Sequence, residues 1–159
     1  MSLAQQCLAE LASSREFFNR STRNLTEALS GYAPADGLMT TAQQVAHVAQ
    51  TVDWFMEGAF RPEGFGMDFD AMMKSVFAVT SLAAARAWYE KAIASASSTL
   101  GAKSDAELMT PLPAGPIMGG APRMAIISAL VDHTAHHRGV LTMYARLNGI
   151  VPPMPYMDM

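Results

Sequence analysis

The sequence is short of the features that define several common protein classes. Its single cysteine, Cys7, cannot form an internal disulfide, which is compatible with a reducing cytoplasm, and no activating motif surrounds it. No apolar run approaches the roughly 18 residues of a membrane span, and the N-terminus lacks the basic start of a signal peptide. Basic residues never cluster beyond a pair and the formal net charge is -3, which leaves nothing to neutralise a phosphate backbone. We therefore expect a cytoplasmic protein without membrane or nucleic-acid partners.

What the sequence does contain is helical periodicity. A chain of 159 residues can bury a core without disulfides, and we expect one domain over residues 1–159. Helix formers with an apolar rhythm of three to four residues fill about residues 3–30, 40–60, 80–101 and 122–149, and no segment alternates like a strand. The pattern predicts an all-α fold, a four-helix bundle that is either up-and-down or built with long crossover connections.

Residues that start and stop helices set these limits. Gly31 is a natural C-terminal cap for the first helix. Thr40 or Thr41 starts the second, because each is followed three residues later by a glutamine, as in a capping box. Pro122 occupies a favoured first-turn position of the last helix, which closes before Gly149.

Three further segments fall outside the long helices. Residues 62–79 are predicted to form a loop with a short helix, and residues 151–156 to pack extended along the bundle. Residues 111–122 are too rich in proline and glycine for regular structure. They lead into the last helix, so they could cover a site there or form a plain surface crossover.

All four histidines lie in two of the predicted helices, His47 in the second and His133, His136 and His137 in the last. Histidine is the commonest metal ligand among side chains, and His133 and His137, four residues apart, share one helix face. His136 lies about 60° to 100° away from both around the helix. Three neutral imidazoles with an open coordination position are typical of catalytic metal sites, and His47 supplies the third.

The histidine pair interrupts the apolar face of the last helix. An unpaired buried polar group costs about 1 to 3 kcal/mol, so each imidazole needs a partner. One metal ion would satisfy both. The alternative is a polar core without metal, in which each histidine is hydrogen-bonded to a carbonyl or a carboxylate.

Several other side chains lie near the histidines by helical angle. Four of them could line a pocket, although packing explains the two aromatic ones equally well: Gln43, Thr51, Trp54 and Tyr144. Asp53 and Asp132 are candidates to accept a hydrogen bond from a metal-ligating histidine. No carboxylate shares the histidine angles, so the sequence identifies no general base.

Three motifs together resemble one known family: Thr41-Ala-Gln-Gln-Val-Ala-His47, His133-Thr-Ala-His-His-Arg-Gly139 and Tyr144-Ala-Arg-Leu-Asn-Gly-Ile-Val-Pro-Pro153. They are similar to the DinB family of damage-inducible-like proteins. The resemblance implies a four-helix bundle with a long crossover, frequently dimeric. It also implies a divalent metal held by three ligands: His47, His133 and His137. Members often carry glutamine where this chain has Val140, so the role of that glutamine is missing or replaced here.

Two functional hypotheses follow. The first is a metal-dependent enzyme of the transferase or hydrolase type, whose metal lowers the pKa of a bound water or substrate thiol. Family relatives resemble transferases and isomerases that use thiols such as bacillithiol or mycothiol, which implies a small-molecule substrate and a low-molecular-weight thiol as cosubstrate. The second is a non-catalytic, stress-associated, metal-binding homodimer. Histidine ligation suits zinc, nickel and iron alike, so the sequence does not select the metal.

Overall fold

The computed structural model describes residues 1–157, and all its regular structure is helical apart from one isolated bridge between Pro111 and Pro122. Four long helices make up the bundle: α1 (Leu3–Thr22), α2 (Thr41–Phe60), α4 (Leu82–Gly101) and α6 (Ile126–Leu147). The connections contain two short helices and two 3-10 turns: α3 (Phe69–Phe77), α5 (Asp105–Met109), η1 (Glu27–Leu29) and η2 (Arg123–Ala125). Among these helices, none is both long and apolar enough to cross a bilayer.

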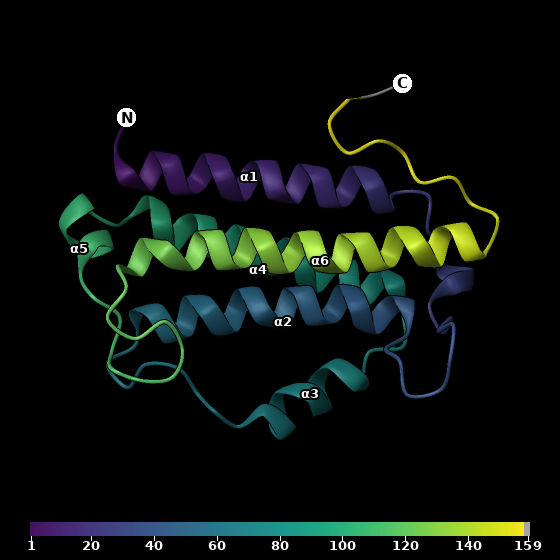
Figure 1. The fold of residues 1–159 in the computed structure, drawn as a ribbon, viewed down its shortest axis with the longest axis horizontal. Helices are drawn as coiled ribbons and strands as arrows, with labels where there is room; N and C mark the ends of the chain where they lie inside the picture. The colour runs from purple at the N-terminus through teal and green to yellow at the C-terminus, as the bar shows by residue number, and fades with distance from the viewer. Residues whose placement is uncertain (158–159) are drawn as a thin grey trace.

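The long helices are arranged as two parallel pairs. Figure 1 shows α1 and α6 running in one direction and α2 and α4 in the other, because the segment that contains α3 carries the chain back before α4 begins. In the packed bundle α2 lies against both α4 and α6, and α1 lies against both α6 and α4. The predicted all-α bundle with a long crossover is therefore confirmed.

The first helix is shorter than the apolar rhythm predicts, since α1 ends at Thr22 and not near residue 30. The Thr22 carbonyl accepts a hydrogen bond from the Arg86 guanidinium, at 2.6 Å, and another from the backbone N–H of Leu25. The chain then turns, buries Leu25 and forms η1. Gly31 accordingly does not cap α1, and the prediction for this boundary is wrong because a distant arginine takes the last carbonyl.

The other boundaries agree more closely with the sequence. Thr40, and not Thr41, caps α2: its hydroxyl accepts from the Gln43 N–H while the Gln43 side chain accepts from the Thr40 N–H. The last helix is preceded by η2 immediately after Pro122, so α6 itself starts at Ile126. Helix α5, which the sequence pattern does not predict, has a capping box of its own between Ser104 and Glu107.

The crossover is attached to α2 by aromatic packing over a glycine. Phe65 makes edge-to-face contacts with Trp54 and Phe55, with ring centroids 5.0 and 5.6 Å apart, and the Trp54 indole donates to the carbonyl of Gly66. Gly58 lies directly under this ring, because a Cβ built there would be 2.2 Å from a carbon of Phe65. The absence of a side chain at Gly58 therefore fixes where the crossover runs.

Tyr89 offers a test of the packing in the bundle core. Its ring packs on Phe18, but its buried hydroxyl has no hydrogen-bond partner within residues 1–157, and burial raises the pKa of its phenol. We expect Tyr89→Phe to stabilise the protein by about 1 kcal/mol, because the uncompensated burial of the hydroxyl is removed. The matched control is Tyr144→Phe, which loses a hydroxyl that donates to Met39 and should destabilise by about 1 kcal/mol. Urea denaturation midpoints measure both, and a loss of stability in Tyr89→Phe would contradict the expectation.

Candidate metal centre

The three histidines singled out by sequence lie together between two neighbouring helices. His47 stands in the middle of α2, and His133 and His137 stand one turn apart on α6. Their ring centroids are 5.0 Å apart for His47 with each partner and 4.5 Å apart for His133 with His137. One nitrogen from each ring lies within 4.8 Å of the others. Three nitrogens on one tetrahedral ion lie roughly 3.3 Å apart, so small side-chain rotations could bring this set onto a metal.

The surroundings keep these imidazoles neutral. Burial is the main cause that lowers all three pKa values, to about 4 for His133 and about 3 for His137. The neighbouring histidines add to the effect, because a positive charge on one ring disfavours protonation of the next. Near pH 7 each ring therefore has a lone pair available for a cation, as metal ligation requires.

Gln44 fixes the tautomer of His137. The Nδ1 atom of His137 lies 2.5 Å from the side-chain oxygen of Gln44, an atom that can only accept, so Nδ1–H donates and Nε2 keeps the lone pair. The Gln44 amide in turn donates to the hydroxyl of Tyr144, which donates to the carbonyl of Met39. A buried chain of hydrogen bonds thus holds one imidazole with Nε2 left free.

The other two histidines differ in their hydrogen bonding. The Thr51 hydroxyl, one turn beyond His47 on α2, lies 3.0 Å from Nε2 of His133. The Nδ1 atom of His47 is buried and has no hydrogen-bond partner among the described residues. A polar core without metal needs a partner for every histidine, and His47 lacks one. The donor set therefore fits a metal ion better than it fits a purely structural cluster.

The remaining predicted neighbours separate into those at the site and those away from it. Thr51 contacts His133 directly, and Tyr144 contacts the site only through Gln44. Gln43 is used as the α2 cap, and Trp54 belongs to the aromatic packing of the crossover. Neither supports the histidines.

Neither candidate aspartate is hydrogen-bonded to a histidine among the described residues, although the charge of Asp132 acts to raise the pKa of His133. Asp53 accepts from the Trp88 indole at 2.8 Å and so faces α4, and Asp132 is exposed. His136 is also exposed, and it lies outside the three-atom set although its ring centroid is 4.9 Å from that of His137. Residues 111–122 likewise contribute nothing to the set, and Pro113 to Ile117 line a small hollow together with residues of the crossover.

Gln44 lies at the site, but the sequence pattern does not identify it. The signal is present, because Gln44 precedes His47 by three residues and so shares its helix face. Two glutamines compete for the capping role, however, and only the structure shows that Gln43 takes it.

The crystal structure of a DinB-like protein from Bacillus subtilis, YjoA, is similar over 97% of this chain and 99% of that chain, with a TM-score of 0.66 and 17% sequence identity. That likeness establishes the fold class. The DinB superfamily profile matches residues 10–141, a span that contains all four histidines, so the chain belongs to the DinB superfamily. Comparison with curated proteins gave no match.

Proposed function

We propose that this protein binds one divalent metal ion through His47, His133 and His137. The observation that carries the proposal is the convergence of three neutral imidazoles from two packed helices, with a buried nitrogen of His47 left without a partner. Zinc, nickel and iron all accept imidazole ligands. Elemental analysis of the purified protein, and its uptake of added metal, should give about one ion per chain. A protein that neither carries nor takes up such an ion would overturn the proposal.

We further propose that the site is catalytic and acts on a small molecule, as a transferase that uses a low-molecular-weight thiol or as a hydrolase. When bound, the metal would supply Lewis acidity, lowering the pKa of a water or a thiol that it contacts. Three protein ligands leave a tetrahedral ion one open position, which supports this assignment. No side chain other than the three histidines is found in the ligand set within residues 1–157.

The chain's own residues have definable roles around such an ion. Gln44 accepts the Nδ1 proton of His137 and so aims its Nε2 atom into the site. The Thr51 hydroxyl can both donate and accept, and its position beside His133 allows it to orient a polar group of a substrate. The buried setting of His137 excludes bulk water from one side of the site.

Activity is tested by comparing metal-loaded and metal-free protein. Low-molecular-weight thiols would be incubated with alkylating or epoxide electrophiles, and ester and amide substrates would be examined in parallel. Turnover is expected only with metal, and His137→Ala should abolish it. If no reaction exceeds the metal-free control while metal is bound at one ion per chain, the catalytic proposal fails and the metal proposal survives.

The second candidate is a non-catalytic, stress-associated, metal-binding homodimer in the cytoplasm. Exposed apolar side chains at the end of α6 and just beyond favour a partner surface, because Met143, Leu147 and Val151 are 55%, 59% and 74% exposed. Light scattering would give the mass in solution. A dimer that binds metal and lacks every activity above would favour the non-catalytic homodimer over an enzyme.

The Gln44 contact can be tested through metal affinity. Removing a hydrogen-bonding partner of a metal-ligating histidine typically costs 10-fold to 100-fold in affinity, and we expect about that loss for Gln44→Leu. Gln44→Glu is the matched control, because its carboxylate still accepts from Nδ1–H and should keep affinity within about threefold. Competition against a chelator measures both. Equal affinity in Gln44→Leu and the wild type would show that the contact does not orient His137.

A further inference from the structure

The His-His-Arg-Gly motif contains one charged residue that the metal centre does not use. Arg138 follows His137 directly but lies about 100° further around α6. Arg138 lies on the same face of α6 as Val131 and Ala135, at spacings of three and four residues. This face is turned toward α1 and away from the three ligating histidines. The motif therefore places His137 on one face of α6 and Arg138 on another.

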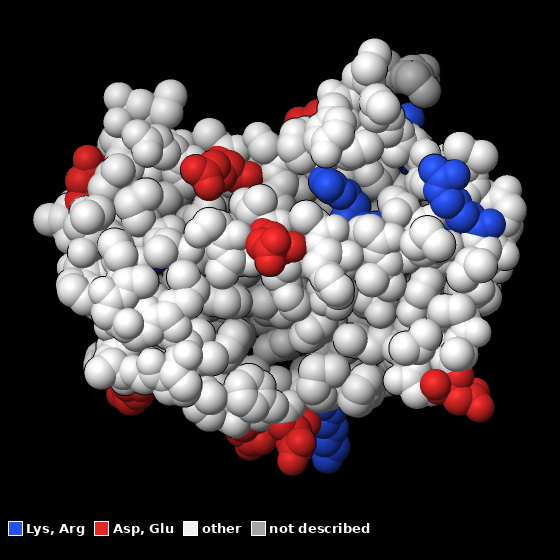
Figure 2. All heavy atoms as spheres, in the orientation of Figure 1, with Lys and Arg blue, Asp and Glu red and all other residues white. Residues whose placement is uncertain are grey.

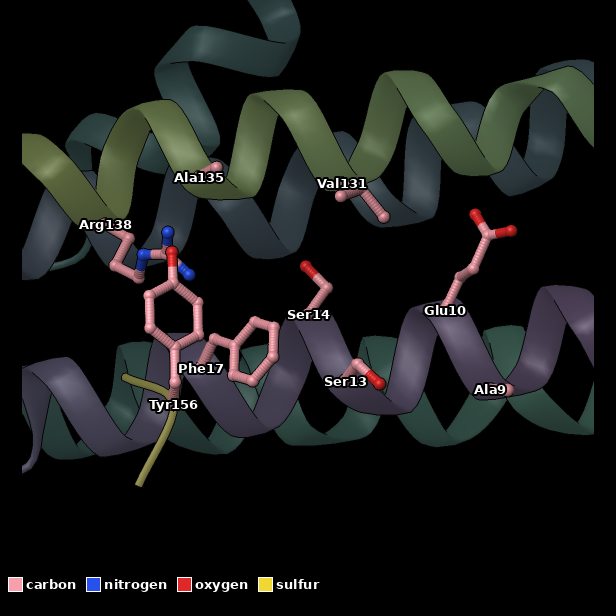
Figure 3. A pocket seen from close by; sticks show the side chains of 9 residues that line it. All are labelled: Ala9, Glu10, Ser13, Ser14, Phe17, Val131, Ala135, Arg138 and Tyr156. Atoms are coloured by element: carbon pink, nitrogen blue, oxygen red, sulfur yellow. The ribbon is translucent and has the colours of Figure 1, made fainter. Parts of the chain in front are cut away.

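This face of α6 forms one wall of a groove between α6 and α1. The groove has a volume of about 450 Å³, which is within the usual range for sites that bind small molecules. Figure 3 shows Arg138 reaching from α6 toward Phe17 and Tyr156, with Ser13 and Ser14 on the floor along α1. Most of the lining is apolar, and Glu10 is the one acidic side chain in it.

The guanidinium of Arg138 has no ion pair within the described residues. Its central carbon lies 5.9 Å from the ring centroid of Phe17, in a cation–π contact. The half-buried stem places the positive charge at one end of the groove, while Glu10 occupies the other end (Figure 3). Figure 2 shows basic side chains at the upper right of this face, over the end of α6, while acidic side chains lie on the left and also along the lower edge.

The C-terminal tail closes the groove at its basic end. Phe17 and Tyr156 pack edge to face, with ring centroids 5.1 Å apart, and Arg20 donates to the carbonyl of Pro155 at 2.8 Å. A second hollow, of about 520 Å³, continues under the tail and shares Ala135 and Arg138 with the first. Arg138 thus stands where the two spaces meet.

We propose that this groove is a second ligand site, distinct from the metal centre, and that it binds a small organic carboxylate with an apolar body. The planar guanidinium of Arg138 can donate a bidentate pair of hydrogen bonds to a carboxylate. The aromatic pair and the small residues of α1 accommodate the apolar part. Glu10 repels an anion at the far end, so only one orientation is favourable. One unpaired positive charge in an apolar groove selects a monoanion.

The test is a titration of the wild-type protein with octanoate, followed by nitrogen–proton correlation NMR. The largest shifts are expected for Ser13 and Ser14 on α1, which lie away from the histidines and so distinguish this site from carboxylate binding at a metal. Arg138→Gln should weaken octanoate binding about tenfold or more, and 1-octanol, with the same chain and no charge, should be affected less than about twofold. Arg61→Gln, which removes an exposed arginine at the end of α2, is the matched control and should change nothing.

A second variant tests the groove by its volume and not by its charge. Ala135→Leu places a larger side chain in the groove and should abolish binding of both octanoate and octanol, with an unchanged helical circular dichroism spectrum. The proposal is overturned if octanoate and octanol bind equally well. It is also overturned if octanoate leaves the α1 signals unchanged while Arg138→Gln converts a dimer to a monomer, because a second copy of the chain would then occupy the groove.

Discussion

Replacing His47, His133 or His137 by alanine is expected to lower the affinity for a divalent ion by about 100-fold or more in each case. The loss should exceed that caused by removing an outer hydrogen-bond partner, since a ligand atom itself disappears. The three nitrogens lie within 4.8 Å of one another, and no fourth side chain belongs to this set among the described residues, so each substitution removes one of three ligands. Titration with Zn²⁺ or Ni²⁺ against a competing chelator measures the affinities.

His136→Ala is the control for these variants. The ring of His136 is exposed and outside the three-atom set, although it contacts His137. We expect its loss to change affinity less than about threefold, because it removes no ligand atom. Equal loss in His136→Ala, or full affinity in His47→Ala, would contradict the three-histidine assignment. Circular dichroism of each metal-free variant would establish that the bundle is intact.

Gly58→Ala is expected to destabilise the protein by about 1 to 3 kcal/mol, the usual cost of forcing extra atoms into a packed region. The new methyl group would start 2.2 Å from the ring of Phe65, so the ring and the crossover attached to it must move. Urea denaturation measures the loss. The emission of Trp54, whose indole donates to Gly66 in the same segment, should report the displacement.

Gly139→Ala is the matched control for Gly58→Ala. Gly139 also lies inside a long helix, but a Cβ built there meets nothing within 4 Å. This substitution should stabilise the protein by about 0.5 to 1 kcal/mol, because alanine has the higher helix propensity. The variant Gly58→Ala with Phe65→Leu should recover part of the lost stability by vacating the ring's space. Equal effects of the two glycine substitutions would show that packing under Phe65 is unimportant.

Local geometry explains why the histidine set can be predicted from the sequence. Residues His133 and His137 share a face on any α-helix, and the apolar residues around them indicate that this face is turned inward. His47 follows from being the one remaining histidine at the centre of another amphipathic helix. That His47 meets this pair depends on α2 packing against α6, which the structure shows.

The end of α1 and the path of the crossover depend on distant residues, and the role of Gln44 depends on a local choice of cap. The end of α1 is set by Arg86, which is 64 residues away from the carbonyl it binds. The role of Gln44 depends on which of two threonines caps α2, a choice that differs by one residue. The position of the crossover depends on Phe65 lying on Gly58, and a glycine in a helical pattern does not indicate which ring covers it.

Because of the order of the helices, the three-histidine centre can form only when the whole bundle has folded. His47 and His133 are 86 positions apart (133 minus 47), with the crossover and α4 between them. The centre is therefore absent until α6, which follows every other helix, has docked against α2. An ion held there would tie the two halves of the chain together and favour the docked state by mass action. A partially synthesised or clipped chain that lacks α6 retains one histidine and cannot compete for the ion, so capture of the ion selects intact copies over fragments.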